Sequence, residues 1–366
     1  MQDFLKTGPL SAYKIWALTP LNIFFNPGIA IHFFFLLSGF VQSYHYYTSN
    51  DPIVLQKSFI KRYFRLAIPT VCVLLMVYAC HKLHWFHKEL IPENILSAGW
   101  TKSLCPDNMG FFKVFMQGIY DCFMGNTRYY PILWTMPAEL QNSFMVLILL
   151  MITHTAKHKT RLFVFWLCVQ LFVFNGYYSA AFTIGMLIAK FDHDSASFRS
   201  FFSKSSVKIL CFVLGIYFGS YPYTGYEHSS EHSIYKLISV FDTIPHILSF
   251  LIGSVFLLLF FLRSQKAQRF FSAKKLRWFG AQSFLFYLVH FLILLSFSPW
   301  LYYKVAAHNS RAVALWTSGL CSFALVTALS YVLTRWIDTP VLALCHKLQD
   351  LVFGRDQRLN NTKAAQ

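Results

Sequence analysis

The sequence predicts an all-α protein that crosses a membrane several times. Of its 366 residues, 56% are hydrophobic and only 13% are charged, whereas soluble domains carry about a quarter charged residues. The mean hydropathy is +0.45. Apolar runs of near-spanning length recur along the chain, and such runs cross lipid as helices that satisfy their own backbone hydrogen bonds. The polar segments are too short to form a separate soluble domain, and the sequence shows no internal repeat.

These runs predict about nine membrane-spanning helices. Their approximate positions are 29–47, 66–84, 137–153, 162–175, 177–190, 207–221, 244–262, 280–301 and 312–335. Asn175 and Gly176 suit a turn between the two short spans in the middle of the chain.

The charges of the loops predict the orientation of the chain. Basic loops alternate with poorly basic ones: residues 263–277 contain six basic residues and no acid, whereas residues 222–243 contain one Lys and three acids. Because basic loops stay in the cytosol, the C-terminal tail at 345–366 is expected to be cytosolic and residues 1–27 non-cytosolic. Residues 1–27 contain no cleavable signal peptide. They look like a loop whose preceding helix is missing.

The net charge of +17 and the cysteines are explained by this topology. The basic residues lie in short loops, where they anchor the spans, so we expect no nucleic-acid binding. The eight cysteines include no Cys-x-x-Cys pair, although Cys105 and Cys122 share a loop and would pair there if it lies outside the cytosol. His81, His84 and His87 have metal-like spacing, but no carboxylate or thiol completes a site, and no metal is predicted.

Ionisable residues within the apolar spans are the functional candidates. Ser283, Tyr287 and His290 are spaced i, i+4 and i+7, so they share one helix face and form a polar stripe. An imidazole there suits proton transfer near neutral pH. The alternative is a histidine that only bonds a neighbouring helix. His32, which has no acidic neighbour at helical spacing, is interpreted as structural.

A second candidate group is basic. Lys61, Arg62 and Arg65 precede the span that is expected to begin at Leu66, and Pro69 would then lie near the helix start, where proline is tolerated. Two guanidinium groups one turn apart can hold phosphates bidentately. The alternative is ordinary anchoring at the cytosolic surface.

Glu139 is a carboxylate inside an apolar run. Pro137 suits the first turn of a helix, which places Glu139 at the third helical position, where the helix dipole stabilises an anion by about 0.3–1 kcal/mol. The loop charges place Glu139 on the non-cytosolic side, away from Arg62 and Arg65.

Together these segments resemble the integral-membrane acyltransferases known as acyltransferase type 3, most closely the fungal form. The matching motifs follow one another in the family's order: "GIAIHFFFLLSGFVQS" (28–43), "FIKRYFRLAIPT" (59–70), "LWTMPAELQNS" (133–143), "FGAQSFLFYLVHFLIL" (279–294) and "RWIDTPVLAL" (335–344). The resemblance covers residues 28–344, which we expect to form one membrane acyltransferase domain.

The resemblance implies an O-acyltransferase that moves an acyl group, commonly acetyl, from cytosolic acyl-CoA to a hydroxyl of a glycan, lipid or small metabolite. His290, Glu139, Tyr287 and Ser283 would be catalytic, and Arg62, Arg65 and Lys61 would bind the acyl-CoA co-substrate. The protein would lie in the plasma membrane or an endomembrane, in contact with the bilayer.

The chain departs from the family pattern in three places. The family usually has ten spans, and the first carries a histidine that is treated as catalytic, but residues 1–27 contain none. Phe284 replaces the usual Tyr, and Asp338 the usual Glu. A truncated gene model and a diverged, non-catalytic relative both stay open. A polytopic transporter or flippase is the other alternative, although the helices lack the repeats typical of transporters.

Overall fold

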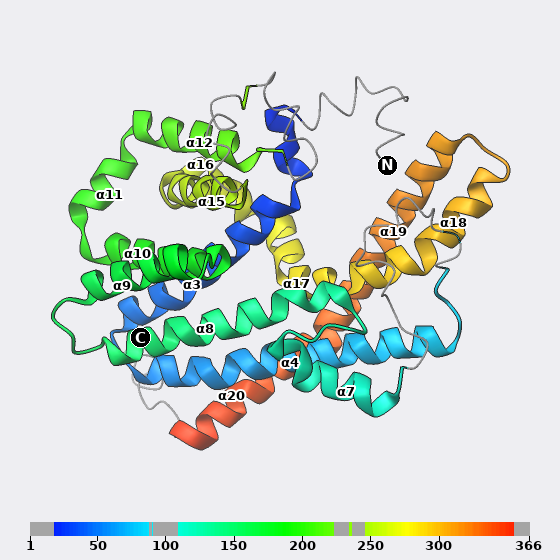
Figure 1. Ribbon diagram of the computed structural model, residues 1–366, viewed down its shortest axis with the longest axis horizontal. Coiled ribbons are helices and arrows are strands. Elements are labelled where there is room, and N and C mark those ends of the chain that lie inside the picture. Colours follow the sequence, from blue (N-terminus) through cyan, green and yellow to red (C-terminus); the bar gives the residue numbers. More distant parts are fainter. Residues whose placement is uncertain (1–17, 88–89, 91–108, 223–233, 236–245, 355–366) are drawn as a thin grey trace. The chain divides into compact units, whose positions relative to one another are not determined.

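The computed structural model describes residues 18–87, 90, 109–222, 234–235 and 246–354. All regular secondary structure in these residues is helical, which confirms the all-α prediction (Figure 1). The chain divides into two compact units: unit 1 comprises Met1–Gln56 and Asn142–Ala273, and unit 2 comprises Lys57–Gln141 and Lys274–Gln366. The first segment of unit 2 begins inside helix α4 (Ile53–Lys82) and ends inside helix α8 (Thr135–Ile152).

Among the described residues, five helical segments are long and apolar enough to cross a membrane, and two bent helix pairs raise the number to seven. The multi-pass prediction is therefore confirmed. The bent pairs are Ala196–Ser203 with Ser205–Gly219, at 77°, and Ile247–Arg263 with Gln265–Phe271, at 93°. The predicted spans 162–175 and 177–190 are helical but do not reach that standard. They correspond to α9 (Lys159–Cys168) with the π-helical η5 (Val169–Val173), and to α10 (Tyr177–Asp194).

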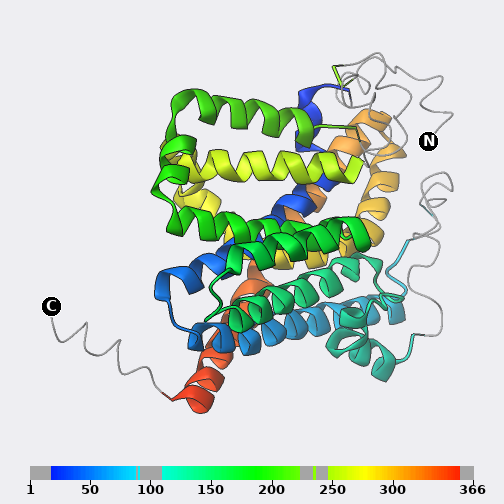
Figure 2. The same cartoon turned by 60° about the vertical axis from the view of Figure 1, so that its left-hand side comes forward.

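Unit 1 is built around two helices whose backbones touch. Helix α3 (Pro27–Ser49) packs on α10 and on α15 (His246–Arg263), and α15 packs on α12 (Ser205–Gly219) (Figure 2). A Cβ on Gly39 would lie 2.1 Å from the Phe182 carbonyl oxygen, and a Cβ on Gly185 would lie 2.1 Å from that of Leu36. Small residues allow this close approach where lipid gives helices no hydrophobic reason to associate.

The remaining short helices of unit 1 lie at the ends of these four. They are η1 (Pro20–Phe24), α11 (Ala196–Ser203) and α16 (Gln265–Phe271). Asn26 caps α3 by accepting the Gly28 N–H at 2.9 Å, and its Nδ2 donates to the Tyr221 carbonyl at 2.8 Å. His32 is buried, donates Nδ1–H to the Gly28 carbonyl at 2.8 Å and packs on Tyr178, in agreement with its structural interpretation.

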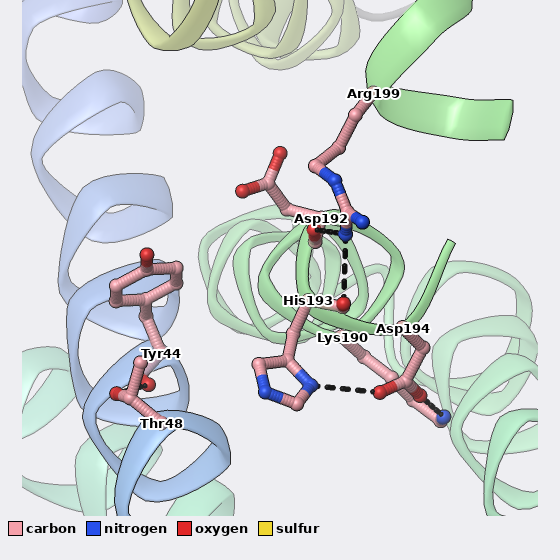
Figure 3. A network of polar contacts seen from close by, with 7 residues as sticks. All are labelled: Tyr44, Thr48, Lys190, Asp192, His193, Asp194 and Arg199. Carbon is pink, nitrogen blue, oxygen red and sulfur yellow. Dashed lines mark hydrogen bonds and ion pairs between the residues drawn. The ribbon is translucent and has the colours of Figure 1, made fainter. Parts of the chain in front are cut away.

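A polar network closes the C-terminal end of α10 (Figure 3). Arg199 donates to the backbone carbonyls of Asp192 at 2.7 Å and of His193 at 2.8 Å. Lys190 and His193 bond the Asp194 carboxylate, and Arg263 of α15 pairs with Asp192. Burial would raise the pKa of Asp194, but its hydrogen bonds to His193 and Lys190 outweigh burial and hold that pKa below its usual range. Basic groups here neutralise the carbonyl end of the helix as well as two carboxylates.

Unit 2 contains the rest of the helices. Helix α17 (Lys274–Leu295) packs on α19 (Arg311–Leu333) and on α18 (Phe297–Ala306). The π-helical η6 (Thr334–Asp338) connects α19 to α20 (Thr339–Phe353). Helix α20 runs beside the start of α4, where Gln349 Nε2 donates to the Lys57 carbonyl at 2.7 Å. The predicted cytosolic tail at 345–366 therefore begins inside α20, and its orientation stays a prediction.

The start of α4 corrects the predicted span 66–84. The helix begins at Ile53, so Pro69 is an interior residue and Lys61, Arg62 and Arg65 lie within the helix rather than before it. The sequence places a boundary at Leu66 because basic residues are costly in an apolar helix. Arg62 and Arg65 have carboxylate partners from distant segments, Glu139 and Asp338, which reduce this cost.

No span is expected between 66–84 and 137–153, so the segment between them is expected to be a loop, but its described part packs against α4. Helix α7 (Phe111–Ile119) runs antiparallel to it: the Phe111 ring lies 6.0 Å from the Tyr78 ring, and the Tyr63 hydroxyl donates to the Ile119 carbonyl at 2.9 Å. Two 3₁₀ helices follow, η3 (Asp121–Met124) and η4 (Pro131–Trp134). Cys122 is buried, and burial raises its pKa to about 12. Its suggested partner Cys105 lies outside the described residues, so the disulfide stays a prediction.

The contact between α3 and α10 can be tested at its glycines. We expect Gly39→Ala to lower the midpoint of thermal unfolding in detergent, since the new methyl group must displace the Phe182 carbonyl, at a cost of about 1–3 kcal/mol. Gly319→Ala is the matched control, because a Cβ there meets nothing within 4 Å. Equal unfolding midpoints for the two variants would show that the helices do not touch at Gly39.

Candidate functional site

A buried ion pair lies at the centre of unit 2. Arg62 Nη1 of α4 donates to Glu139 Oε1 of α8 at 2.7 Å. Glu139 is 1% exposed and the Arg62 side chain 22%. A short contact between a guanidinium and a carboxylate is a charge-assisted hydrogen bond. Each group is the counter-charge that the other needs in apolar surroundings.

This contact corrects two predictions about Glu139. The prediction that Glu139 and Arg62 lie on opposite sides of the membrane is wrong, because their side chains touch. Glu139 is also not at the third helical position, since α8 starts at Thr135 and has no acidic residue in its first turn.

The start of α8 explains why the two charges meet. Met136 Sδ accepts a hydrogen bond from Thr70 Oγ1 at 3.9 Å, so α8 begins halfway along α4. From there it runs antiparallel to α4, and Glu139 comes level with Arg62, two turns before Thr70.

Tyr287 of α17 holds the segment that leads into α8. Its hydroxyl donates to the Ile132 carbonyl at 2.5 Å and bonds Thr135 Oγ1 at 2.9 Å. Nearby, the Tyr130 hydroxyl donates to the Leu288 carbonyl at 2.7 Å. The phenol of Tyr287 is therefore fully engaged with η4 and α8. This geometry makes Tyr287 a positioning residue.

His290 lies one turn further along α17. Its Nδ1 is 2.6 Å from the Tyr287 carbonyl oxygen. A carbonyl only accepts, so Nδ1 carries the proton and neutral imidazole keeps the lone pair of Nε2. A histidine held in this way can take a proton from a substrate at Nε2.

Ser283 shares the helix face but not the contacts. It is exposed, and its hydroxyl donates to the Gly280 carbonyl of its own helix at 2.9 Å. Within the described part of the chain, no hydrogen bond joins it to Tyr287 or His290. The structure thus brings Tyr287 and His290 together by contact and leaves Ser283 near them only by helical spacing.

The other two basic candidates, Arg65 and Lys61, make weaker contacts within the protein than Arg62 does. Arg65 Nε lies 3.9 Å from Asp338 Oδ1, and the Arg65 side chain is 46% exposed. Lys61 is half-buried, and its backbone carbonyl lies 4.0 Å from Cys345 Sγ of α20. Arg65 therefore keeps guanidinium N–H groups for a ligand, whereas Arg62 is held by Glu139. The described residues contain no group of three or more His, Cys, Asp or Glu side chains placed to hold a metal ion.

Three of these contacts join sequence motifs that are far apart. Arg62–Glu139, Thr135–Tyr287 and Arg65–Asp338 connect residues 59–70, 133–143, 279–294 and 335–344 within unit 2. A comparison with known proteins matches the acyltransferase domain of acyltransferase type 3 over residues 4–335. The chain belongs to this family. The predicted family is therefore confirmed, and the protein is a membrane acyltransferase.

Two fungal relatives carry the same activity in their names. Acyltransferase clz18 of Cochliobolus lunatus is 23% identical over 392 residues, which cover 90% of this chain and 82% of the relative. Acyltransferase R4 of a Phoma species is 22% identical over 347 residues, covering 79% and 72%. No solved structure matches the chain.

Sequence reasoning missed several residues of this candidate site. The hydroxyls of Thr135 and Tyr130 make hydrogen bonds to α17, and Met136 Sδ accepts a hydrogen bond from Thr70, but none of these three side chains lies among the charged or imidazole groups that drew attention to the other candidates. The lead-in Trp-Thr-Met-Pro before Ala138 and Glu139 was the available signal. Its residues matter because Thr135, Met136 and Glu139 each contact a different point on a neighbouring helix.

The Arg62–Glu139 pair predicts coupled effects on stability. Arg62→Met and Glu139→Gln each leave a charge without its partner, and we expect each to lower the free energy of unfolding by about 3 kcal/mol. The double variant should lose less than the sum, with a coupling energy of about 2 kcal/mol. Unfolding in detergent measures all four proteins. Additive losses would mean that the two side chains do not interact.

Tyr287 gives a separate prediction. Tyr287→Phe removes both bonds of the phenol and leaves the half-buried Ile132 carbonyl without this donor, which should cost about 1–3 kcal/mol of unfolding free energy. Tyr303→Phe is the matched control, since Tyr303 is 43% exposed. The same unfolding measurement compares the two variants. A loss of unfolding free energy no larger than that of the control would show that the hydrogen bonds of Tyr287 do not hold α17 in place.

Proposed function

We propose that this acyltransferase moves an acyl group, acetyl in the first instance, from cytosolic acyl-CoA to a hydroxyl of a glycan, lipid or small metabolite. The observation that carries the proposal is the hydrogen bond between His290 Nδ1 and the Tyr287 carbonyl. It leaves Nε2 of His290 as a base beside a framework fixed by Tyr287 and the Arg62–Glu139 pair. The membership of the family supplies the reaction class.

The transfer needs one base and one leaving group. The acceptor hydroxyl gives its proton to His290 Nε2 as its oxygen attacks the thioester carbonyl carbon. The new C–O bond forms, the C–S bond breaks, and the CoA thiolate leaves and takes the proton from the imidazolium. Tyr287 fixes the ring by its backbone carbonyl and holds α17 by its phenol. In this role Glu139 acts through Arg62 and not on the acceptor.

The acyl-CoA would be bound through its phosphates. Arg65 is exposed and only loosely paired with Asp338, and a guanidinium binds phosphate oxygens bidentately. Lys61, one turn before it, adds a second positive charge. Arg62, through its ion pair with Glu139, holds this part of α4 against α8. The basic loops support a cytosolic donor side, with the C-terminus on the same side, in the plasma membrane or an endomembrane.

A transfer assay tests the role of His290. Membranes containing the full chain are given acetyl-CoA labelled in the acetyl group together with glycan and lipid fractions, and labelled acceptor is counted. We expect His290→Ala to reduce transfer by about 10²–10⁴-fold, because it removes the general base. His308→Ala, at an exposed histidine between α18 and α19, should transfer as the unchanged protein does.

Two outcomes would contradict the proposal. Equal labelling by the unchanged protein and His290→Ala would remove His290 from the chemistry. Labelling no greater than in membranes without the protein, with acetyl-CoA and longer acyl-CoAs, would favour a non-catalytic relative that binds a lipid or glycan.

A further inference from the structure

A pocket lies in unit 2, between the start of α17 and the junction of α19 with η6. Its volume is about 430 Å³, and its lining includes Trp278, Gln282, Tyr331, Arg335 and Thr339. Pockets of this size hold small ligands or the headgroup of a larger one. None of these residues has a part in the transfer proposed above.

The pocket is on the face of α17 opposite Tyr287. Residues of a helix are about 100° apart, so Trp278 differs from Tyr287 by about 180° and Gln282 differs from Tyr287 by about 140°. His290 is about 120° from Trp278 and about 80° from Gln282, but it lies eight residues, or about 12 Å, beyond Gln282 along the helix. A ligand in the pocket would therefore not meet Nε2 of His290, and the pocket is a separate site.

Gln282 supplies a buried donor to the pocket. It is 2% exposed, and its Oε1 accepts from Ser330 Oγ at 3.1 Å. Its Nε2, although buried, has no hydrogen-bond partner within the residues that the structure describes. A buried amide N–H without an acceptor is costly, by about 1–3 kcal/mol. A ligand that brings an acceptor oxygen would remove this cost.

Arg335 supplies a cation at the same place. It lies in the π-helical η6, and π-helical turns are often found at functional sites. Its guanidinium makes no ion pair with any carboxylate in the described ranges, unlike Arg62 and Arg65. An unpaired guanidinium beside an unpaired amide N–H matches a ligand with several acceptor oxygens and negative charge, such as a phosphate.

The surroundings indicate where that phosphate comes from. Trp278 and Tyr331 are 42% and 44% exposed, and their ring centroids are 5.7 Å apart. Exposed Trp and Tyr at the end of membrane helices mark the level of the lipid headgroups. Lys274, Lys275 and Arg277 precede Trp278 at the end of the most basic segment of the chain. Basic pockets between membrane helices at this level bind anionic lipids.

We propose that this pocket binds the phosphate headgroup of an anionic glycerophospholipid, with Arg335 pairing the phosphate, Gln282 Nε2 donating to it, and Trp278 and Tyr331 flanking the glycerol. The lipid belongs to the leaflet that faces the basic loops. It fills a groove between α17 and η6 and so braces α17 from the side opposite Tyr287.

Native mass spectrometry of the detergent-purified full chain tests this site. The protein is incubated with equal amounts of phosphatidylglycerol and phosphatidylcholine, and bound lipids are counted. We expect one tightly held phosphatidylglycerol, favoured about tenfold over phosphatidylcholine, as one charge-assisted contact would give. Arg335→Gln should abolish the preference. Gln282→Glu, which keeps the acceptor for Ser330 but repels phosphate, should do the same.

The controls separate this site from general attraction. Arg311→Gln removes an exposed charge at the other end of α19 and should leave the preference unchanged. Elution as a single species without added lipid shows that each variant is folded. An unchanged preference in Arg335→Gln, an equal loss in Arg311→Gln, or displacement of the lipid by millimolar inorganic phosphate would overturn the proposal, the last by identifying a site for free phosphate.

Discussion

The ion pair between Arg62 and Glu139 is the constraint on which the rest of unit 2 depends. Neither charge is tolerable alone in an apolar helix, so the pair requires α8 to begin beside the middle of α4. That start fixes the positions of Thr135 and η4. The Tyr287 hydroxyl of α17 donates to the Ile132 carbonyl of η4 and accepts from Thr135 Oγ1. His290, one turn along, receives its orientation from the Tyr287 carbonyl. The carboxylate is thus connected to the base by a chain of direct contacts, without lying next to it.

Whether a charged side chain already has an ion-pair partner separates structural charges from charges that are available to ligands. In unit 1, Asp192 is paired with Arg263. Asp194 is paired with Lys190, and Arg199 donates to backbone carbonyls (Figure 3). Arg62 is paired in the same manner. Arg65 is held loosely, and Arg335 makes no ion pair with any described carboxylate. Among these three arginines of unit 2, the two that are less neutralised are the ones to which we assign phosphates, those of acyl-CoA at Arg65 and of a lipid at Arg335.

Composition and motif spacing predicted the class of the fold, the family and most of the residues that meet in unit 2. Helix boundaries were harder, because the start of α4 depends on counter-charges 77 residues away at Glu139 and further still at Asp338. Likewise, the bond of Thr135 to Tyr287 joins residues 152 apart. Residues 111–134 read as a loop because their short helices are stabilised by packing on α4, which local sequence does not reveal. The wide turn of η6 had no sequence signal.

A charge swap tests most directly whether Glu139 is kept to neutralise Arg62. The measurement is the fraction of each detergent-extracted protein that elutes as a single folded species. Arg62→Glu and Glu139→Arg each place two like charges together and should reduce that fraction severely, whereas the combined variant restores opposite charges and should recover much of it. A combined variant that folds no better than the worse single variant would contradict the central place of this pair.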